Sequence, residues 1–349
     1  MIRPFHATTA LALLGLAASP ADAQQSVEQF YRGKTITLTI PTSPGGINDI
    51  SGRLVSRHIG NFIPGRPGVI VQNVPGGGGL VAANKIYNTT ERDGLSISII
   101  QRGVPQLAIQ GDSNAKFDPM QMTWLGSLSS YATDRYLLLV NSKFYAKSAE
   151  DLRKPGVPLK IGGDQPGSTN LTFATMSKLV LDLNVDVIRG YPGAAPMFLA
   201  MQGGELDGQV IGYNAVRAGQ AALWEQKLVR PLVQFGRDTR LPELSDVPTG
   251  QELVTDPAKK QVLLFAELPF RMALPFLAPP GLPADRAKAL QDAFMQMTRD
   301  KAFLDDATRV NVEISAIDGN AVRDVIAMMQ ATPKEVLARY NDIDAAVRK

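Results

Sequence analysis

The sequence predicts an α/β fold made of two domains. Short strand-like segments alternate with helix-period segments, which is the pattern of a mostly parallel sheet flanked by helices. The alternation occurs in two series, one before and one after a polar stretch at Gly111–Pro119. The chain has 349 residues, and at about 150 residues per domain this length suits two domains.

The composition is that of an ordinary folded protein, and it excludes several kinds of chemistry. Hydrophobic residues make up 44% of the chain and charged residues 20%. The net charge of +3 predicts no binding of nucleic acid. The absence of cysteine excludes disulfides, thiolate nucleophiles and cysteine-ligated metals. Because His6 and His58 are the only histidines, we expect no catalytic triad, no metal site and no cofactor.

The first 23 residues are typical of a secretory signal peptide. Arg3 precedes an apolar run at 10–18, and Ala21-Asp22-Ala23 forms a cleavage site of small residues. The run is too short to span a membrane, which takes about 20 apolar residues. The alternative is a buried N-terminal helix. We expect cleavage after Ala23 and a soluble mature chain in the periplasm.

The first series consists of strands that lead into glycine-rich loops and then into helices. Residues 35–40 alternate β-branched and apolar side chains, which predicts a strand. Ile50, Leu54 and His58 share one face of the helix that follows it. The series comprises a strand at 35–40, a turn at 43–49, a helix from 50, a strand at 69–71, a glycine loop at 76–79, a helix at 80–87 and a strand at 95–100.

The second series predicts another α/β unit, and the chain then returns to the first. Residues 271–278 contain Pro275 and suit an extended crossing, while Leu290, Phe294 and Met297 mark a helix. The predicted strands lie near 124–125, 136–140, 160–161, 187–188, 209–211 and 231–235, with helices at 171–181 and 195–201. The predicted division is a signal peptide at 1–23, a first domain at 24–125 and 271–349, and a second domain at 126–270. Two crossings between the domains would form a hinge.

The two glycine loops of the first domain predict a cradle for an anion. Both follow a strand and precede a helix, at the sheet edge where open α/β folds bind ligands. Glycines let backbone N–H groups converge, and each helix N-terminus adds positive potential. Three or four such N–H bonds to a carboxylate, at roughly 1.5–3 kcal/mol each, approach the roughly 8 kcal/mol of micromolar binding. The alternative is two mobile surface turns. The predicted ligand residues of these loops are Thr42, Ser43, Gly45, Gly46, Asn48, Asp49, Gly76, Gly77, Gly78 and Gly79.

Two charged residues near the cradle have open roles. Asp49 caps the helix that begins near Ile50, or it accepts a hydrogen bond from an ammonium or hydroxyl group of the ligand. Arg102, at the end of the third strand, is a candidate for binding a second carboxylate, or it is solvated. Thr42, Ser43 and Asn48 would supply hydroxyl and amide contacts.

The second domain presents further candidates where its strands end. Gly167, Ser168 and Thr169 would bind the far end of the ligand, or the two hydroxyl residues cap a helix starting near Leu171. Tyr191, Pro192 and Gly193 follow the next strand, where Tyr191 serves as a flat wall, as a hydroxyl donor or as an ordinary packed aromatic. Tyr213, beside Asn214, is a weaker candidate.

Two short motifs found in enzymes occur, but the residues that usually accompany them are missing. Residues 77–82 fit the dinucleotide-binding pattern G-x-G-x-x-A, but Ile97 and Ser98 stand where an acidic residue would hold the ribose, and Arg102 is the only hint of a 2′-phosphate site. Residues 113–116 fit the S-x-x-K pattern of serine acyl enzymes, but they lie in a polar turn. An enzyme would also need a proton-shuttling pair, for which only His58 is present. We therefore expect a binding protein with no catalytic residues.

In its two glycine loops and in several other short motifs, the sequence resembles the Bug family, the extracytoplasmic receptors of tripartite tricarboxylate transporters. The matching motifs cover nearly the whole mature chain; they lie at 41–49, 73–79, 93–94, 167–168, 190–196, 203–207, 230–232, 244–249 and 278–283. The resemblance implies a type II periplasmic binding protein fold, in which two domains close on a small organic acid. It also implies that backbone amides and bridging waters hold one carboxylate in the two glycine loops, with Ser168, Thr169 and Tyr191–Gly193 facing them. The implied partners are the permease subunits of a membrane transporter. A sensor that feeds a signalling partner is the alternative, and we expect a monomer.

The sequence departs from the family pattern in its pocket rather than in its frame. Thr42 stands where an aromatic residue is usual, and Gln101-Arg102-Gly103 replaces a turn rich in Ser or Thr. Asn170 stands where histidine is frequent. The class of acid is therefore less well defined by the resemblance than the fold.

Overall fold

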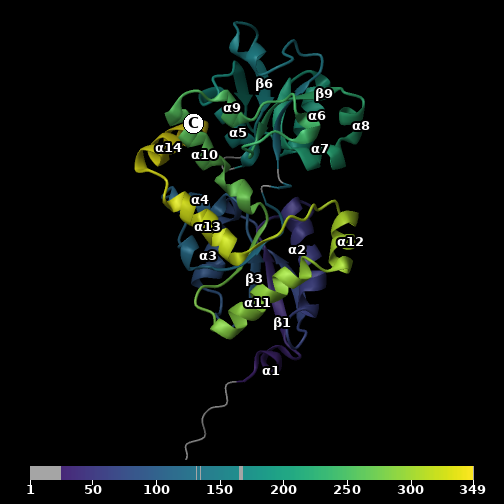
Figure 1. Cartoon of the computed structure of the whole chain (residues 1–349), viewed down its shortest axis with the longest axis vertical. Helices are drawn as coiled ribbons and strands as arrows, with labels where there is room; N and C mark the ends of the chain where they lie inside the picture. The colour runs from purple at the N-terminus through teal and green to yellow at the C-terminus, as the bar shows by residue number, and fades with distance from the viewer. Residues whose placement is uncertain (1–24, 131, 134, 165–167, 349) are drawn as a thin grey trace, which may run out of the picture.

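The computed structural model describes residues 25–130, 132–133, 135–164 and 168–348 and consists of two lobes stacked along the long axis (Figure 1). Each lobe contains one sheet with helices packed against it. This confirms the predicted α/β class with two units. The predicted signal peptide and its cleavage site lie outside the described residues.

The first lobe is built on a six-stranded sheet in the order β11-β4-β10-β3-β1-β2. Strands β1, β2 and β3 are parallel, and β10 runs antiparallel to both β3 and β4. The strands are β1 (Thr35–Ile40), β2 (Gly68–Asn73), β3 (Ser96–Ile99), β4 (Thr123–Ser127), β10 (Pro275–Ala278) and β11 (Ile317–Asp318). The predicted crossing at 271–278 thus ends as a strand of this sheet.

The second lobe is built on a five-stranded sheet in the order β7-β6-β8-β5-β9. Strands β6, β7 and β8 are parallel to one another, and β5 runs antiparallel to its neighbours β8 and β9. The strands are β5 (Tyr136–Asn141), β6 (Leu159–Gly162), β7 (Val185–Ile188), β8 (Gly208–Gly212) and β9 (Val229–Phe235).

The helices cover both sheets and join the lobes. The α-helices are α1 (Val27–Tyr31), α2 (Ile47–His58), α3 (Leu80–Asn88), α4 (Val104–Ile109), α5 (Thr169–Leu179), α6 (Ala194–Gly203), α7 (Tyr213–Gly219), α8 (Ala221–Glu225), α9 (Gly250–Leu253), α10 (Pro257–Glu267), α11 (Ala284–Met297), α12 (Lys301–Arg309), α13 (Gly319–Gln330) and α14 (Lys334–Arg348). The 3₁₀ turns are η1 (Ile59–Asn61), η2 (Gly77–Gly79), η3 (Pro119–Gln121), η4 (Glu150–Arg153), η5 (Pro242–Leu244) and η6 (Leu268–Met272).

The carboxyl ends of the parallel strands in the two sheets face one another. Strand β4 runs in the same direction as β1–β3, and its last residue, Ser127, leads into the connection to β5. Tyr136, the first residue of β5, pairs with Gly212 at the end of β8 and with Phe235 at the end of β9. The loops that follow β1, β2, β3, β6 and β8 therefore all lie on the sides of the sheets that meet at the connection.

A continuous apolar core crosses the junction on one side of the molecule. Phe270 of η6 is buried and makes edge-to-face contacts with Tyr136 and Phe173, at ring-centroid distances of 5.3 and 5.4 Å. Helix α14 adds to this junction, because Tyr340 packs on Phe265 of α10 and Asn341 donates a hydrogen bond to the Gln110 carbonyl after α4. Burial of these aromatic rings favours the arrangement of the lobes seen here.

The domain boundaries remain a proposal. We place them in the connections between the two sheets, around 128–135 and 236–274. Within the range 271–349 that the sequence assigns to the first domain, α14 packs on α5 and α10 beside the second sheet. The prediction did not foresee this third passage between the lobes.

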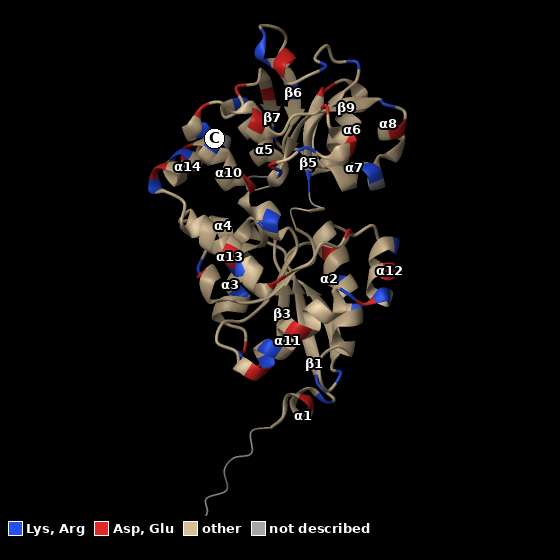
Figure 2. Ribbon diagram, in the orientation of Figure 1, with Lys and Arg blue, Asp and Glu red and all other residues tan. Residues whose placement is uncertain are grey.

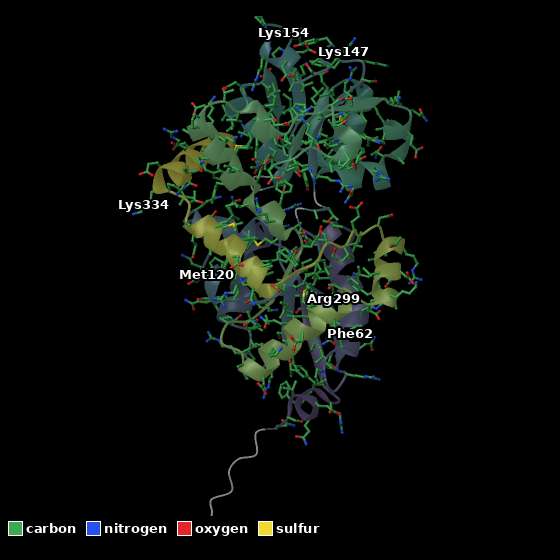
Figure 3. The ribbon with its side chains drawn as sticks, viewed as in Figure 1. Phe62, Met120, Lys147, Lys154, Arg299 and Lys334 are labelled. Atoms are coloured by element: carbon green, nitrogen blue, oxygen red, sulfur yellow. The ribbon has the colours of Figure 1, made fainter. Side chains whose placement is uncertain are left out.

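Charge is distributed over the whole molecule. Figure 2 shows acidic and basic side chains interspersed on both lobes. Lys147 and Lys154 lie at the end of the second lobe farthest from the first (Figure 3). Within the described residues, no helix is both long and apolar enough to cross a membrane.

Candidate functional site

Three strand-end loops of the first lobe meet at Gly79. A Cβ atom placed on Gly79 would lie 3.6 Å from the Pro41 Cβ, 3.6 Å from the Gln101 Oε1 and 3.2 Å from the Val104 Cγ2. Pro41 follows β1, Gly79 follows β2, and Gln101 and Val104 follow β3. The two glycine loops that the sequence singled out are therefore neighbours, and the third loop lies against them.

The second of these loops requires glycine because of its backbone conformation. Gly76, Gly77, Gly78 and Gly79 have φ angles of 140°, 55°, 63° and 99°, a region in which side chains of L residues are strained. The Gly79 N–H donates to the Gly76 carbonyl at 2.9 Å and closes the bend. Gly76, Gly77 and Gly78 are exposed, so their peptide groups remain accessible to a ligand.

The first loop is held in shape by the buried carboxylate of Asp49. Asp49 accepts hydrogen bonds from the Gly45 N–H at 2.9 Å, from Asn73 Nδ2 at 2.8 Å and from Arg53 Nε at 3.0 Å. Asn73 also donates to the Thr42 carbonyl at 2.8 Å, which ties the end of β2 to the loop after β1. Burial raises the pKa of Asp49, but the hydrogen bonds from Arg53, Asn73 and Gly45 outweigh it and hold the pKa below its ordinary value.

Asp49 is not the N-cap of its helix, contrary to one of its two expected roles. Helix α2 begins at Ile47, earlier than predicted, and Gly46 is its N-cap residue. Asp49 therefore lies in the first turn, where it binds backbone that precedes the helix. Its oxygens are engaged by protein donors, which leaves the other role, contact with the ligand, as a prediction.

Five of the helices that follow strands at the facing sheet edges begin after glycine; α5 is the exception, with Ser168 as its N-cap residue. The N-cap residues of α2, α3, α4, α6 and α7 are Gly46, Gly79, Gly103, Gly193 and Gly212. By contrast, α1, α9, α10, α12 and α13 begin at Ser26, Thr249, Asp256, Asp300 and Asp318, and each of these side chains accepts a first-turn N–H. Because glycine has no side chain to serve as a cap, the N-cap residue leaves the first-turn N–H groups of the glycine-started helices to other acceptors. In α3, the Leu80 and Val81 N–H groups donate to the Gly77 and Gly76 carbonyls. At the N-termini of the long helices α2 and α3, the helix dipole suits an anion.

The third loop places Gln101, and not Arg102, beside the glycines. The Arg102 guanidinium lies over the rings of Phe270 and Tyr136, with its Cζ 4.7 and 5.2 Å from their centroids, and its Nη2 is 3.4 Å from the Tyr136 hydroxyl. Burial lowers the pKa of Arg102, with Tyr136 opposing the change. Gln101 was not among the predicted site residues. Its position shortly after β3, at a sheet edge where ligands bind, is the signal that could have indicated it.

In the second lobe, the loop after β6 uses its serine to cap a helix. Ser168 accepts the Leu171 N–H at 3.2 Å as N-cap of α5, which confirms the capping role for this residue, and it also donates to Asp164. Thr169 is the first residue of α5 and is not its N-cap, contrary to its expected capping role. Burial raises the pKa of Asp164, while its hydrogen bond with Ser168 opposes the rise. Thr169 and Arg102 line one small cavity of about 40 Å³ between the lobes, room for about one water molecule. Gly167 lies outside the described residues.

The two tyrosines of the second lobe are engaged by protein. The Tyr191 hydroxyl donates to Glu205 Oε1 at 2.8 Å, and burial, followed by this contact, raises its pKa. Tyr213 is buried, with its ring 5.1 Å from the Trp224 ring, and burial is the main cause of its raised pKa. Pro192 and Gly193 lead directly into α6. Whether these four residues contact a ligand stays a prediction.

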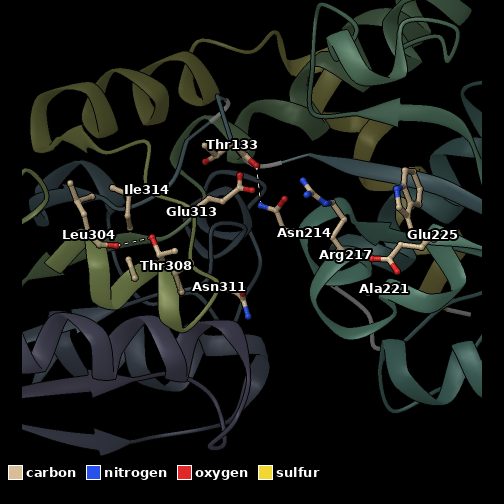
Figure 4. A pocket seen from close by; sticks show the side chains of 13 residues that line it. Thr133, Asn214, Arg217, Ala221, Glu225, Leu304, Thr308, Asn311, Glu313 and Ile314 are labelled. Atoms are coloured by element: carbon tan, nitrogen blue, oxygen red, sulfur yellow. Dashed lines mark hydrogen bonds between the residues drawn. The ribbon is translucent and has the colours of Figure 1, made fainter. Parts of the chain in front are cut away.

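The structure contains a larger cavity between the lobes, where a ligand cleft is expected, but most of its lining residues were not predicted. It has a volume of about 570 Å³ and lies between α7 and α8 of the second lobe and α12 of the first. Figure 4 shows Arg217 and Asn214 on one side and Glu313, Thr308 and Ile314 on the other. Of the residues that the sequence put forward, Asn214, named beside Tyr213, lines it, and none of the residues of the two glycine loops does. Its walls come from helices distant in sequence, so no local motif marks it.

His58 lies at the opposite end of α2 from the first glycine loop. His58 is the last residue of α2, about 18 Å of helix from Gly46, and its Nε2 lies 2.9 Å from Asp306 Oδ2. The described part of the chain contains no group of three or more acidic or histidine side chains able to hold a metal.

Comparison with known proteins identifies the kind of protein to which this architecture belongs. Residues 63–341 match the model of the tripartite tricarboxylate transporter family receptor. A UPF0065 protein of Cupriavidus necator, encoded in the gbd 5′ region, is 28% identical over 295 residues, covering 82% of this chain and 80% of that protein.

Two solved structures share the fold. A TctC solute-binding protein from Polaromonas aligns with a TM-score of 0.64 and 18% identity, over 90% of this chain and 99% of that one. A Rhodopseudomonas palustris protein solved with adipate aligns with a TM-score of 0.62 and 19% identity, over 90% of this chain and 97% of that one. At these identities the likeness establishes the fold, which confirms the predicted periplasmic binding protein architecture.

Proposed function

This chain belongs to the tripartite tricarboxylate transporter receptor family, and from that premise we propose that it captures a small organic acid between its lobes and presents it to a membrane permease. A receptor of this family is a solute-binding protein that serves transport. We also propose that the chain acts in the periplasm, exported by its N-terminal leader, and that it binds its ligand without a covalent step.

The meeting of the three strand-end loops at Gly79 is the observation that carries the proposal. It supports a site in which main-chain N–H groups of the bends before α2 and α3 hold a carboxylate. Charged hydrogen bonds of roughly 1.5–3 kcal/mol each would allow three or four of them to account for micromolar binding. The adipate bound to the R. palustris protein is a dicarboxylic acid, which supports a carboxylate as the class of ligand here.

Closure of the lobes would complete the site. The loops after β6 and β8 lie on the facing edge of the second sheet, and a ligand held by the first lobe would contact them when the lobes approach. A permease that recognises the closed form would then distinguish the loaded receptor from the empty one.

Thermal unfolding with a panel of organic acids tests the proposal. A ligand present at one hundred times its Kd should stabilise the protein by about 2.7 kcal/mol, and a Lys154→Ala variant, changed at the outer end of the second lobe, should respond equally. An unchanged melting temperature with every acid tested would refute a carboxylate receptor.

A further inference from the structure

We propose that the acid recognised by this receptor carries a single carboxylate on an apolar body. This inference rests on the proposed function and narrows it to a class of substrate. It follows from the charge and polarity of the side chains beside the glycine loops and from the position of Arg102, which lies over aromatic rings.

No described residue of the two glycine loops, 41–49 and 74–82, is a lysine or arginine. The third loop contributes the neutral amide of Gln101, whose Oε1 is 3.6 Å from a Cβ placed on Gly79. Arg102 lies over the Phe270 and Tyr136 rings instead. Arg53, just outside the first loop, is bound through its Nε to Asp49 and through its Nη2 to Asn73. A second carboxylate brought here would thus be desolvated without a cation that is not already paired, at a high cost in free energy.

The acidic groups of the two lobes leave no surplus of positive charge for a second carboxylate. Asp49 is buried, and its pKa lies below its ordinary value, so it is ionised at neutral pH and balances the charge of Arg53, with which it forms an ion pair. Asp164 belongs to the loop after β6 in the facing lobe. Arg189 is the cation nearest in sequence to the predicted residues Tyr191–Gly193, and it is exposed after β7. It is therefore the residue to test as a rival partner for a second carboxylate.

Two aliphatic side chains border the glycine bends and are open to solvent. Ile47, directly after Gly46, is 50% exposed, and Val81, in the first turn of α3, is 48% exposed. Val81 lies over the second bend, because its Cγ2 is 2.9 Å from a Cβ placed on Gly76. An apolar ligand body that covers these side chains would remove their surface from water.

Calorimetric titration with five acids tests the inference: acetate, hexanoate, phenylacetate, succinate and adipate. We expect hexanoate or phenylacetate to bind at least tenfold more tightly than either dicarboxylate. A Val81→Ser change should weaken hexanoate and phenylacetate about tenfold and acetate less than twofold. Val157→Ser is the matched control, since Val157 is 66% exposed and belongs to the second lobe between η4 and β6; it should leave all affinities unchanged.

The outcomes separate this inference from the proposed function. If succinate or adipate binds as tightly as the monocarboxylates, and more weakly after Arg189→Ala, the receptor recognises two carboxylates and only the inference is overturned. Equal losses for acetate and hexanoate in Val81→Ser would also overturn it, because Val81 would then support the bend rather than the ligand body. If none of the five acids binds, both the inference and the carboxylate function fail.

Discussion

The carboxylate of Asp49 accepts the backbone N–H of Gly45 at 2.9 Å, four residues before it in the chain. This bond holds the Gly45 N–H against the first turn of α2. The same carboxylate reaches Asn73 at the end of β2. One buried acid therefore sets the conformation of the first loop and ties it to the strand that leads into the second.

Replacing Asp49 by Asn should loosen this loop. The amide keeps one acceptor but places an NH₂ group against donors, so we expect a loss of about 1–3 kcal/mol in unfolding free energy and weaker acid binding. Because the folded-state pKa of Asp49 is lowered, its stabilisation is present above the unfolded-state value near 4 and is lost as the pH falls through the lower folded-state value. Urea unfolding between pH 2 and 7 measures the loss of unfolding free energy and its pH dependence, and calorimetric titration measures the loss of acid binding. Asp292→Asn, which alters an exposed pair with Lys288, should change stability by less than about 0.5 kcal/mol.

Replacing Gly78 by Val should abolish acid binding and leave a folded protein. The φ angle of 63° strains any β-branched residue, while the space around the position is open, with Gln101 Oε1 at 4.0 Å from an added Cβ. The bend is therefore expected to reshape rather than clash. Gly111→Val provides the control, because Gly111 has a φ angle of 81°, an open surrounding and a position after α4. Equal thermal shifts with ligand in the two variants would mean that the second loop does not hold the acid.

The buried carboxyl group of Glu267 should make stability depend on pH. Burial raises its pKa to about 7, against hydrogen bonds from Gln251 and the Gly236 N–H; of the nearby charges, Asp238 adds to the rise and Arg271 opposes it. Between an unfolded-state pKa near 4.5 and about 7, the unfolded chain has lost this proton and the folded chain retains it, so stability falls as the pH rises, by at most about 3 kcal/mol. Glu267→Gln should flatten this slope, whereas exposed Glu335→Gln should not. A slope that persists in Glu267→Gln would assign it to another group.

Replacing Arg102 by Met should reduce stability without changing the preference among acids. The substitution keeps a long apolar stem and removes two cation–π contacts, at about 0.5–1 kcal/mol each. Affinities for hexanoate and adipate should then change by the same factor. A selective loss of adipate binding would instead support the sequence-based prediction that Arg102 binds a second carboxylate.

The sequence predicts the framework of this protein well because strands and glycine turns are local features. The strands predicted at 35–40 and 69–71 are found as the parallel strands β1 and β2, the second extended to Gly68–Asn73, and their glycine bends meet at Gly79. The capping of α5 by Ser168 was also among the expected roles. These outcomes depend on alternation, turn chemistry and neighbouring strand order, all of which are visible along the chain.

Features that depend on distant packing were not predictable in the same way. The direction of Arg102 is set by Phe270, a residue 168 positions later, and the cavity of Figure 4 is formed by α7, α8 and α12. Helix α14 has an ordinary amphipathic pattern, which says that one face is buried but not against which partner. Its contacts with α5 and α10 emerge only in three dimensions.

The glycine starts of α2 and α3 have a consequence for how such a receptor can evolve. A binding site made of main-chain N–H groups keeps its donors when neighbouring side chains are replaced, because every residue except proline carries the same donor. In the proposed site, mutations at Gln101, Ile47 or Val81 would therefore alter which solute is preferred while main-chain N–H groups still bind its carboxylate. Ancestral and descendant receptors would then bind different acids through the same main-chain carboxylate site.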